Sequence, residues 1–135
     1  MTGEKIIIDA MNAALGRLAS YAAKQLLLGN SVAIVNCDNA LISGRKQNII
    51  SKYQQEIARG SYSQRGPHFP KTPDRIVKRT VRGMLSYKQG RGATAFKNLR
   101  CYKDIPQEYQ EAKKITLSKE FKIKTLALKE LSQRI

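Results

Sequence analysis

The chain has 135 residues, and 25 Lys or Arg against 10 Asp or Glu give it a formal net charge of +15. Its length fits one domain, and its 41% hydrophobic content excludes a wholly disordered basic tail, because a core can form. No apolar run approaches the roughly 20 residues that cross a bilayer, and residues 1–8 form no secretory signal. We therefore expect a soluble, intracellular protein whose Cys37 and Cys101 are reduced thiols, packed like small hydrophobes.

The positive charge is concentrated in one part of the chain. Residues 1–43 carry three basic and three acidic side chains, and residues 104–135 carry seven and five. Residues 44–103 carry 15 basic side chains and only two acidic ones, a net charge of +13. This distribution predicts a nearly neutral scaffold that carries one basic functional region at 44–103.

The first third of the chain predicts a parallel βαβ unit. The apolar, β-branched runs at 6–8 and 32–35 are typical of strands that are buried on both faces. Between them, apolar residues recur at spacings of three and four over 15–28, which predicts a helix that stops at Gly29. One helix between two such strands implies a right-handed parallel connection. A weaker strand is expected at 40–42.

The basic region is predicted to begin with a helix and a long loop. Ser43 is a suitable N-cap for a helix that begins at 44–46 and carries an apolar stripe from Ile49 to Ile57. Residues 60–73 break this periodicity with two glycines and three prolines, so we expect a loop there. Loops of this length in a compact domain are usually functional or disordered.

A second helix in the basic region, from Asp74 to Leu85, is predicted to have two faces. Thr72 is a suitable N-cap, Pro73 suits the first turn, and Asp74 complements the positive end of the helix. One interpretation of its basic side is a solvated surface, but charge of a single sign favours binding of a polyanion. The basic side carries Arg75, Lys78, Arg79 and Arg82, and the opposite side carries Ile76, Val77, Val81, Met84 and Leu85.

The segment after this helix contains a glycine motif. Residues 90–95 match the dinucleotide-binding pattern G-x-G-x-x-A, but no strand precedes them, so we reject that function. Gly90–Gly92 is interpreted instead as a flexible basic turn that follows a phosphate backbone, or as an ordinary surface turn without a binding role. Further on, a short helix is expected at 93–99, a strand at 99–102 and a helix at about 125–134. Residues 1–114 are predicted to form one domain, and 115–135 a C-terminal extension.

Catalytic motifs are absent from the sequence. The chain has one histidine and two separated cysteines, too few for a four-ligand Cys/His zinc site, and no P-loop or G-x-S-x-G motif. Asp9 is the best single catalytic candidate, since ligand sites of open α/β folds gather at the ends of strands. The favoured interpretation of Asp9 is a turn residue whose side chain hydrogen-bonds the nearby backbone. We expect no enzymatic activity, no cofactor and no metal.

Several segments of the chain together resemble one known protein family. The opening I-D-A at 8–10 and L-G-R-L-A-S at 15–20 are similar to the start of that family. The most specific match is R-G-P-H-F at 65–69, followed by R-T-V-R-G-M-L at 79–85. L-R-C-Y at 99–102 continues the match in the family's order. Together these segments resemble the ribosomal protein L13 family of the large subunit, and the R-G-P loop is typical of its archaeal and eukaryotic branch.

This resemblance implies a three-layer α/β/α domain with a mostly parallel four-stranded sheet. It also implies a structural, non-catalytic role in the cytoplasm, as a large-subunit protein that binds 23S-type ribosomal RNA and supports subunit assembly. Neighbouring large-subunit ribosomal proteins are the expected protein partners, with no membrane, no small-molecule substrate and no homo-oligomer. The residues expected to face RNA are Arg45, Lys46, Arg59, Arg65, His68, Lys71, Arg75, Lys78, Arg79, Arg82, Lys88, Arg91 and Lys97.

Recognition is expected to depend more on RNA shape and backbone than on base edges, because A-form RNA hides those edges in a deep groove. Tyr62, His68 and Phe69 are candidates to stack on splayed bases, and Phe69 is equally a candidate for the protein's own core. Two other classes stay open: a non-ribosomal RNA-binding or RNA-processing protein, and a basic module that binds DNA or anionic membranes. Neither has a supporting motif in this chain.

Overall fold

The N-terminal part of the chain forms the predicted βαβ unit. The structure is a computed structural model, and it describes residues 3–58, 70–117 and 122–135. Strand β1 (Lys5–Asp9) and strand β2 (Ser31–Val35) pair in parallel and are connected by helix α1 (Leu15–Leu27). The buried side chains of α1 include the predicted apolar positions, so the 3.6-residue periodicity identified this helix correctly.

The main sheet has four parallel strands in the order β4-β2-β1-β5, which confirms the predicted α/β class. Strand β4 (Leu99–Cys101) pairs with β2, and strand β5 (Ile115–Thr116) pairs with β1. The predicted strand near 40–42 exists as β3 (Leu41–Ser43), but it lies outside this sheet. It pairs antiparallel with β6 (Thr125–Ala127) in a separate two-stranded sheet. The fourth strand of the main sheet is therefore β5.

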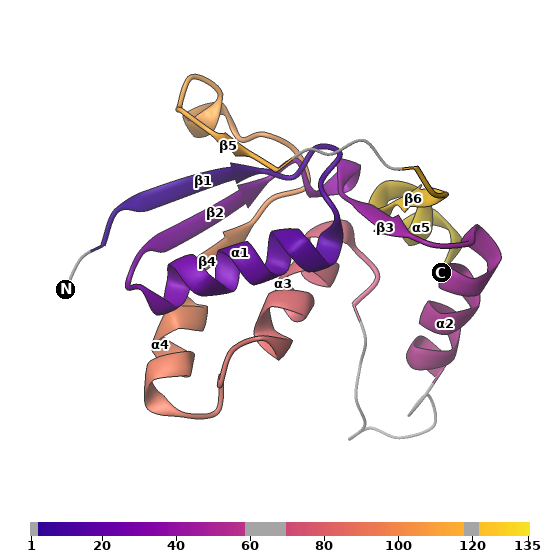
Figure 1. Cartoon of the computed structure of the whole chain (residues 1–135), viewed down its shortest axis with the longest axis horizontal. Helices are drawn as coiled ribbons and strands as arrows, with labels where there is room; N and C mark the ends of the chain where they lie inside the picture. The colour runs from indigo at the N-terminus through magenta and orange to yellow at the C-terminus, as the bar shows by residue number, and fades with distance from the viewer. Residues whose placement is uncertain (1–2, 59–69, 118–121) are drawn as a thin grey trace.

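The two faces of the main sheet are covered differently, because the chain changes direction across the sheet after β4. The steps from β1 to β2 and from β2 to β4 run the same way, and right-handed crossovers place both connections on one face. The step from β4 to β5 runs back across β2 and β1, so its connection covers the opposite face (Figure 1). That connection contains the 3₁₀ turn η2 (Gln107–Tyr109). In the described residues, the third layer is thus an irregular segment where an α-helix was expected.

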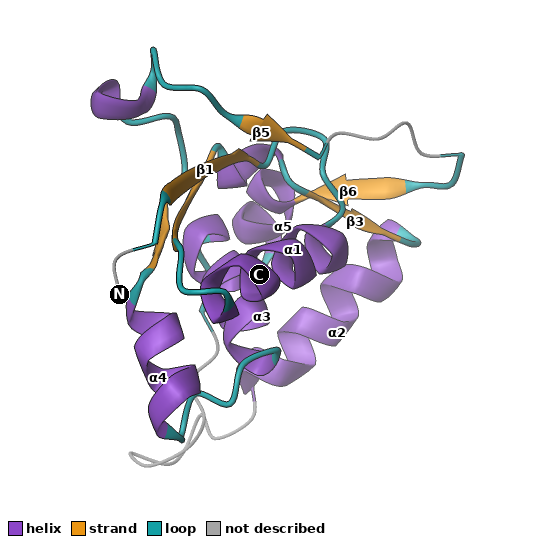
Figure 2. Cartoon of the chain, turned by 60° about the vertical axis from the view of Figure 1, so that its left-hand side comes forward, coloured by secondary structure: helices purple, strands orange, loops and turns teal. Residues whose placement is uncertain are grey.

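Each face has its own apolar cluster, as the strand alternation requires. Ile7, Ala33 and Val35 pack against Tyr109 of η2 on the thinner face. The larger core includes Ile8 and Ile34 and lies under α1 and two further helices, α3 (Pro73–Gly83) and α4 (Gly90–Lys97) (Figure 2). The C-terminal helix α5 (Leu128–Arg134) completes it. Three leucines from the C-terminal segment are at most 2% exposed in this core: Leu126, Leu128 and Leu131.

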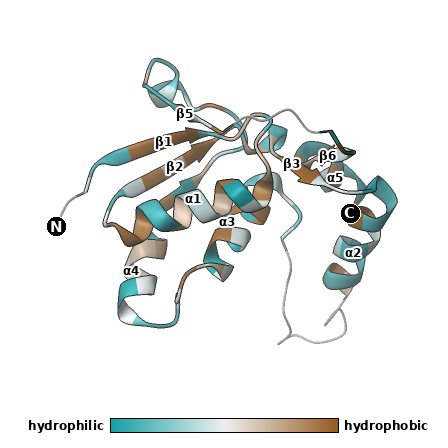
Figure 3. Cartoon of the chain, viewed as in Figure 1, coloured by the Kyte–Doolittle hydropathy of each residue, from teal (hydrophilic) through white to brown (hydrophobic). Residues whose placement is uncertain are grey.

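Helix α2 (Lys46–Ala58) buries little of its surface. Ile49 is its one buried residue, whereas Ile50 and Tyr53 from the predicted stripe are partly buried. Figure 3 shows the contrast between the hydrophobic strands β1 and β2 and the largely hydrophilic α2. The short 3₁₀ turn η1 (Cys37–Asn39), which lies between β2 and β3 in the chain, is part of the central core through Cys37.

The two cysteines are free thiols that lie beside each other. Cys37 is buried, and Cys101 of β4 is partly buried. A hydrogen bond with the Cys101 thiol, together with burial, raises the pKa of Cys37 far above its usual range. Cys37 is therefore a protonated core residue at neutral pH, in agreement with its predicted packing role.

The predicted flexible turn at Gly90–Gly92 is instead the first turn of α4. The Met84–Gln89 segment before it connects two helices, which confirms that no strand precedes the glycine motif. A Cβ atom on Gly92 would lie 2.0 Å from the backbone carbonyl oxygen of Ser86. Close approach to that carbonyl, and not flexibility, is the physical reason for this glycine.

Replacing Gly92 with alanine is expected to destabilise the protein by about 1–3 kcal/mol, since either the helix or the Ser86 backbone must move. Gly90→Ala is the matched control, because a Cβ there meets nothing within 4 Å. It should change the free energy of unfolding by no more than about 0.5 kcal/mol. Urea denaturation of both variants measures the difference, and equal stabilities would refute the close-packing explanation.

Candidate nucleic-acid interface

Helix α3 begins at Pro73, one residue before the predicted start, and its N-terminus contains the predicted residues. Thr72 occupies the N-cap position with an extended backbone, Pro73 follows in the first turn, and Asp74 supplies the acid there. The Thr72 side chain makes no capping hydrogen bond, and its Oγ1 atom is buried without a hydrogen-bond partner. The start of α3 therefore depends on the fixed φ of proline and on the favourable charge of Asp74, rather than on a side-chain cap.

The two-faced character of α3 is confirmed. Ile76, Val77 and Val81 are at most 3% exposed and pack into the central core. On the other side, Arg75 is exposed, whereas Lys78, Arg79 and Arg82 are half-buried. Met84 departs from the prediction, since it is 44% exposed beyond the end of the helix. We call Arg75, Lys78, Arg79 and Arg82 the α3 stripe.

Aromatic rings, rather than acids, contact two cations of the α3 stripe. The Lys78 ammonium lies 5.4 Å from the centre of the Phe96 ring, and the Arg82 guanidinium lies 4.7 Å from that of Tyr87. Cation–π contacts of this kind hold a side chain in place without cancelling its charge. The salt bridges within the described ranges all involve Glu130, on α5. Lys78 and Arg82 thus keep their positive charge.

A hollow joins the N-terminal half of α3 to the edge strand β4. It brings Arg100 beside Arg75 and Lys78, so three cations from two elements share one concave surface. Sequence reasoning missed Arg100. The available signal was the strand alternation, since Leu99 is buried while Arg100 is exposed. We call this surface the α3–β4 hollow; it is lined by Asp74, Arg75, Lys78, Arg100, Cys101 and Tyr102.

Several other residues that were predicted to face RNA do not line the α3–β4 hollow. Lys71, Lys88 and Lys97 are exposed near the ends of α3 and α4. Arg91 is also exposed, but its guanidinium donates a 3.0 Å hydrogen bond to the carbonyl oxygen of Leu27, at the C-terminal end of α1. This cation therefore stabilises the negative end of α1.

The predicted pair at the start of α2 does not join the α3–β4 hollow. Arg45 and Lys46 are exposed at the start of α2, and Figure 1 shows α2 at the opposite end of the molecule from α4. Lys46 forms an ion pair with Glu130. The same carboxylate oxygen of Glu130 also lies 3.6 Å from a guanidinium nitrogen of Arg134. The loop residues Arg59, Arg65 and His68, like Tyr62 and Phe69, lie outside the described residues.

The Lys46–Glu130 ion pair should make stability depend on pH. Its hydrogen bond from Lys46 lowers the pKa of Glu130 from the usual 4.5. A lowered folded-state pKa means that the pair stabilises the fold above pH 4.5 and that this contribution is lost as the pH falls through the lowered value. Glu130→Gln should therefore be less stable than the parent near pH 7, and the two melting temperatures should converge in acid. A pH-independent difference would rule out this linkage.

Asp9 has the local role that was favoured for it. Its Oδ1 atom accepts a 3.0 Å hydrogen bond from the Met11 backbone N–H and a 3.4 Å bond from the Asn36 side chain. Asn36 has a left-handed backbone with φ of 64° and also accepts a bond from Asn39. These bonds connect the turns that follow β1 and β2, so Asp9 organises the carboxyl edge of the sheet.

Two other kinds of feature are absent from residues 3–58, 70–117 and 122–135. No group of three or more His, Cys, Asp or Glu side chains is placed to hold a metal ion there. None of the helices in these ranges is long and apolar enough to cross a membrane. The main chemical feature of the described surface is the positive charge of the α3 stripe and the α3–β4 hollow.

Comparison with known proteins identifies the family of this chain. A family described as "Ribosomal protein L13" matches residues 4–108. "Large ribosomal subunit protein uL13" of Methanosarcina barkeri is 47% identical over 113 residues, which cover 83% of this chain and 80% of that protein. The protein of the same name from Natronomonas pharaonis is 43% identical over 131 residues, covering 96% and 90% of the two chains. The chain therefore belongs to the ribosomal protein L13 family.

Proposed function

We propose that this chain is a structural protein of the large ribosomal subunit and that it binds ribosomal RNA there. Its relatives in the L13 family carry the name of a large-subunit protein, and the match extends over most of the chain. The observation that supports RNA binding most directly is the gathering of Arg75, Lys78 and Arg100 in the α3–β4 hollow. Neighbouring proteins of the large subunit are the expected protein partners.

The α3–β4 hollow suits a phosphate backbone better than a small anion. Its cations come from a helix and an edge strand, so they lie along a surface rather than around a point. Arginine presents a planar fork that binds two phosphate oxygens at once, and lysine adds a mobile point charge. A folded RNA that places successive phosphates along this surface would neutralise all three cations. Recognition of this kind reads RNA shape and backbone more than base identity.

The decisive experiment is sedimentation of the full chain with purified large ribosomal subunits through a high-salt gradient. The chain should travel with the subunit, because a protein that binds folded RNA specifically stays bound at salt concentrations that release nonspecifically bound basic proteins. Recovery at the top of the gradient would contradict the proposal. In a salt-matched competition, structured ribosomal RNA should displace the chain from duplex DNA and from anionic vesicles. Equal competition by DNA would instead favour a general polyanion-binding module.

A further inference from the structure

The α3–β4 hollow contains an aromatic ring beside its cations. Tyr102 is partly buried and lines this surface together with Arg75, Lys78 and Arg100. The hollow has a volume of about 450 Å³, which lies within the range of sites that hold small organic groups. It therefore has room for more than a phosphate, and the ring offers a surface that a phosphate does not need.

The backbone fixes Tyr102 next to Arg100. The Tyr102 N–H donates a 2.8 Å hydrogen bond to the Ile34 carbonyl, and the Tyr102 carbonyl accepts a 3.1 Å bond from the Cys37 N–H. These bonds continue the parallel pairing of β4 with β2 beyond the last residue of β4. Side chains two residues apart on an extended strand project to the same side, about 7 Å from each other. Arg100 and Tyr102 thus lie side by side at the edge of the main sheet.

A second tyrosine holds the Tyr102 ring in place. The ring of Tyr109, in η2, lies 5.8 Å from that of Tyr102 with an angle of 60° between the planes, an edge-to-face contact. Burial, and then the neighbouring Tyr109, raise the pKa of Tyr102, so its phenol stays neutral and repels no phosphate. Because the protein already holds this ring, a ligand that stacks on it loses little side-chain entropy.

The cations beside Tyr102 are available to a ligand. Across residues 3–58, 70–117 and 122–135, the side chains of Arg75 and Arg100 take part in no hydrogen bond, ion pair or ring contact. Asp74 is the one acid among the lining residues, and its charge also complements the N-terminus of α3. Three cations against one acid leave the hollow positive, which favours a ligand that carries phosphate.

The geometry points to a binding site for one unpaired nucleotide of RNA in the α3–β4 hollow, with its base stacked on Tyr102 and its phosphate bound by Arg100. An inorganic anion would use the cations and leave the ring unused, whereas a nucleotide uses both. Stacking accepts any base, because every base has a π-face, so this site fits recognition of RNA shape and backbone. The inference rests on the proposed function, since it names the part of the RNA that the hollow binds.

The test compares two labelled strands that carry the same number of phosphates: the pentaribonucleotide AAAAA and a strand of five abasic units. Binding of the full chain to each is measured by fluorescence anisotropy. Tyr102→Leu should weaken binding of AAAAA about fivefold or more, because a stacked base is lost, and should change binding of the abasic strand less than about twofold. Tyr102→Phe keeps the ring and should stay within about twofold of the parent for both strands.

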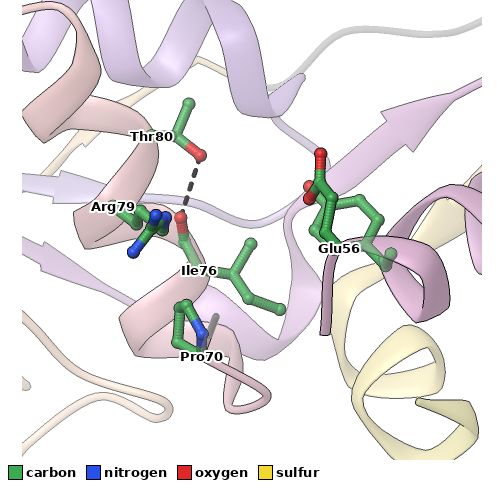
Figure 4. Close-up of a pocket in the computed structure, with 6 residues that line it drawn as sticks. Glu56, Pro70, Ile76, Arg79 and Thr80 are labelled. Carbon is green, nitrogen blue, oxygen red and sulfur yellow. Dashed lines mark hydrogen bonds between the residues drawn. The ribbon is translucent and has the colours of Figure 1, made fainter. Parts of the chain in front are cut away.

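Tyr53→Leu is the matched control. Tyr53 is also a partly buried tyrosine, but it lines a separate cavity between α2 and α3, together with Glu56 and Thr80 (Figure 4). This variant should bind both strands as the parent does. NMR of the parent chain gives a readout that needs no variant, since a stacked base shields the ring below it. The ring-proton signals of Tyr102 should move upfield with AAAAA, and those of Tyr53 should not.

The outcomes separate this site from RNA binding in general. Equal losses of the two strands in Tyr102→Leu, or Tyr102 ring signals that do not move with AAAAA, overturn the stacking site. If structured ribosomal RNA still binds with steep salt dependence in that case, the proposed function stands without the site. Binding of AAAAA through Tyr102 by a chain that fails to bind structured ribosomal RNA would instead support the stacking site and contradict the proposed function.

Discussion

Neutralising the α3–β4 hollow should reduce affinity for structured ribosomal RNA about a hundredfold at physiological salt. The variant combines Arg75→Gln, Lys78→Gln and Arg100→Gln, which together remove the three cations that line the hollow. Each lost phosphate contact should lower the magnitude of the log–log salt slope by about 0.7–0.9, so the slope should fall by roughly two to three. Anisotropy titrations over a range of salt concentrations measure both quantities.

A second triple variant separates the position of the charge from its amount. Lys113→Gln, Lys122→Gln and Lys124→Gln remove the same charge from exposed positions in the C-terminal part of the chain. If the hollow binds the RNA backbone, this control should reduce affinity far less than the first variant and leave the salt slope nearly unchanged. Equal losses in the two variants would mean that net charge, and not the α3–β4 hollow, determines RNA affinity.

Local patterns predicted most of the elements, because helices and buried strands depend on short-range periodicity. The bounds of α1 and α3 agree with the sequence to within a few residues, since Gly29 and Pro73 mark their ends through the backbone conformations they favour. The basic side of α3 was equally readable, because its cations and its core residues alternate on a regular helix. These features require no knowledge of distant parts of the chain.

Features that depend on distant residues were not readable. Leu41–Ser43 was a recognisable strand, but its partner is Thr125–Ala127, more than 80 positions away, and no local pattern identifies that pairing. Gly92 looked like a residue of a flexible turn, whereas its contact with the Ser86 carbonyl exists only in the folded chain. The same is true of Lys46, whose ion pair with Glu130 depends on the packing of α5 near α2.

The α3–β4 hollow combines residues that were predicted from local sequence with one that depends on the fold. Arg75 and Lys78 were predicted from a single helix, but Arg100 joins them only because β4 lies at the sheet edge beside α3. Conversely, Arg45 and Lys46 were grouped with them by sequence, and the fold places that pair elsewhere. Charge counting along the chain therefore located the basic region, while the topology selects which of its cations act together.

Leu131→Ala is expected to lower the free energy of unfolding by about 2–5 kcal/mol, the largest effect on stability that we predict. Leu131 is fully buried in the central core with Leu126 and Leu128, although all three belong to the predicted C-terminal extension. Removing its side chain leaves a cavity where α5 packs against η1 and α3, and the surrounding core can relax only partly. Urea denaturation followed by circular dichroism measures the change.

Leu28→Ala is the matched control for this substitution. Leu28 is 65% exposed at the end of α1, so the same truncation there should change stability by no more than about 0.5 kcal/mol. If Leu131→Ala had an equally small effect, residues 115–135 would be a separable extension that docks on a domain complete at residue 114. A large loss with a single cooperative transition would mean that the C-terminal segment folds together with the parallel sheet, because one core then unfolds as a unit.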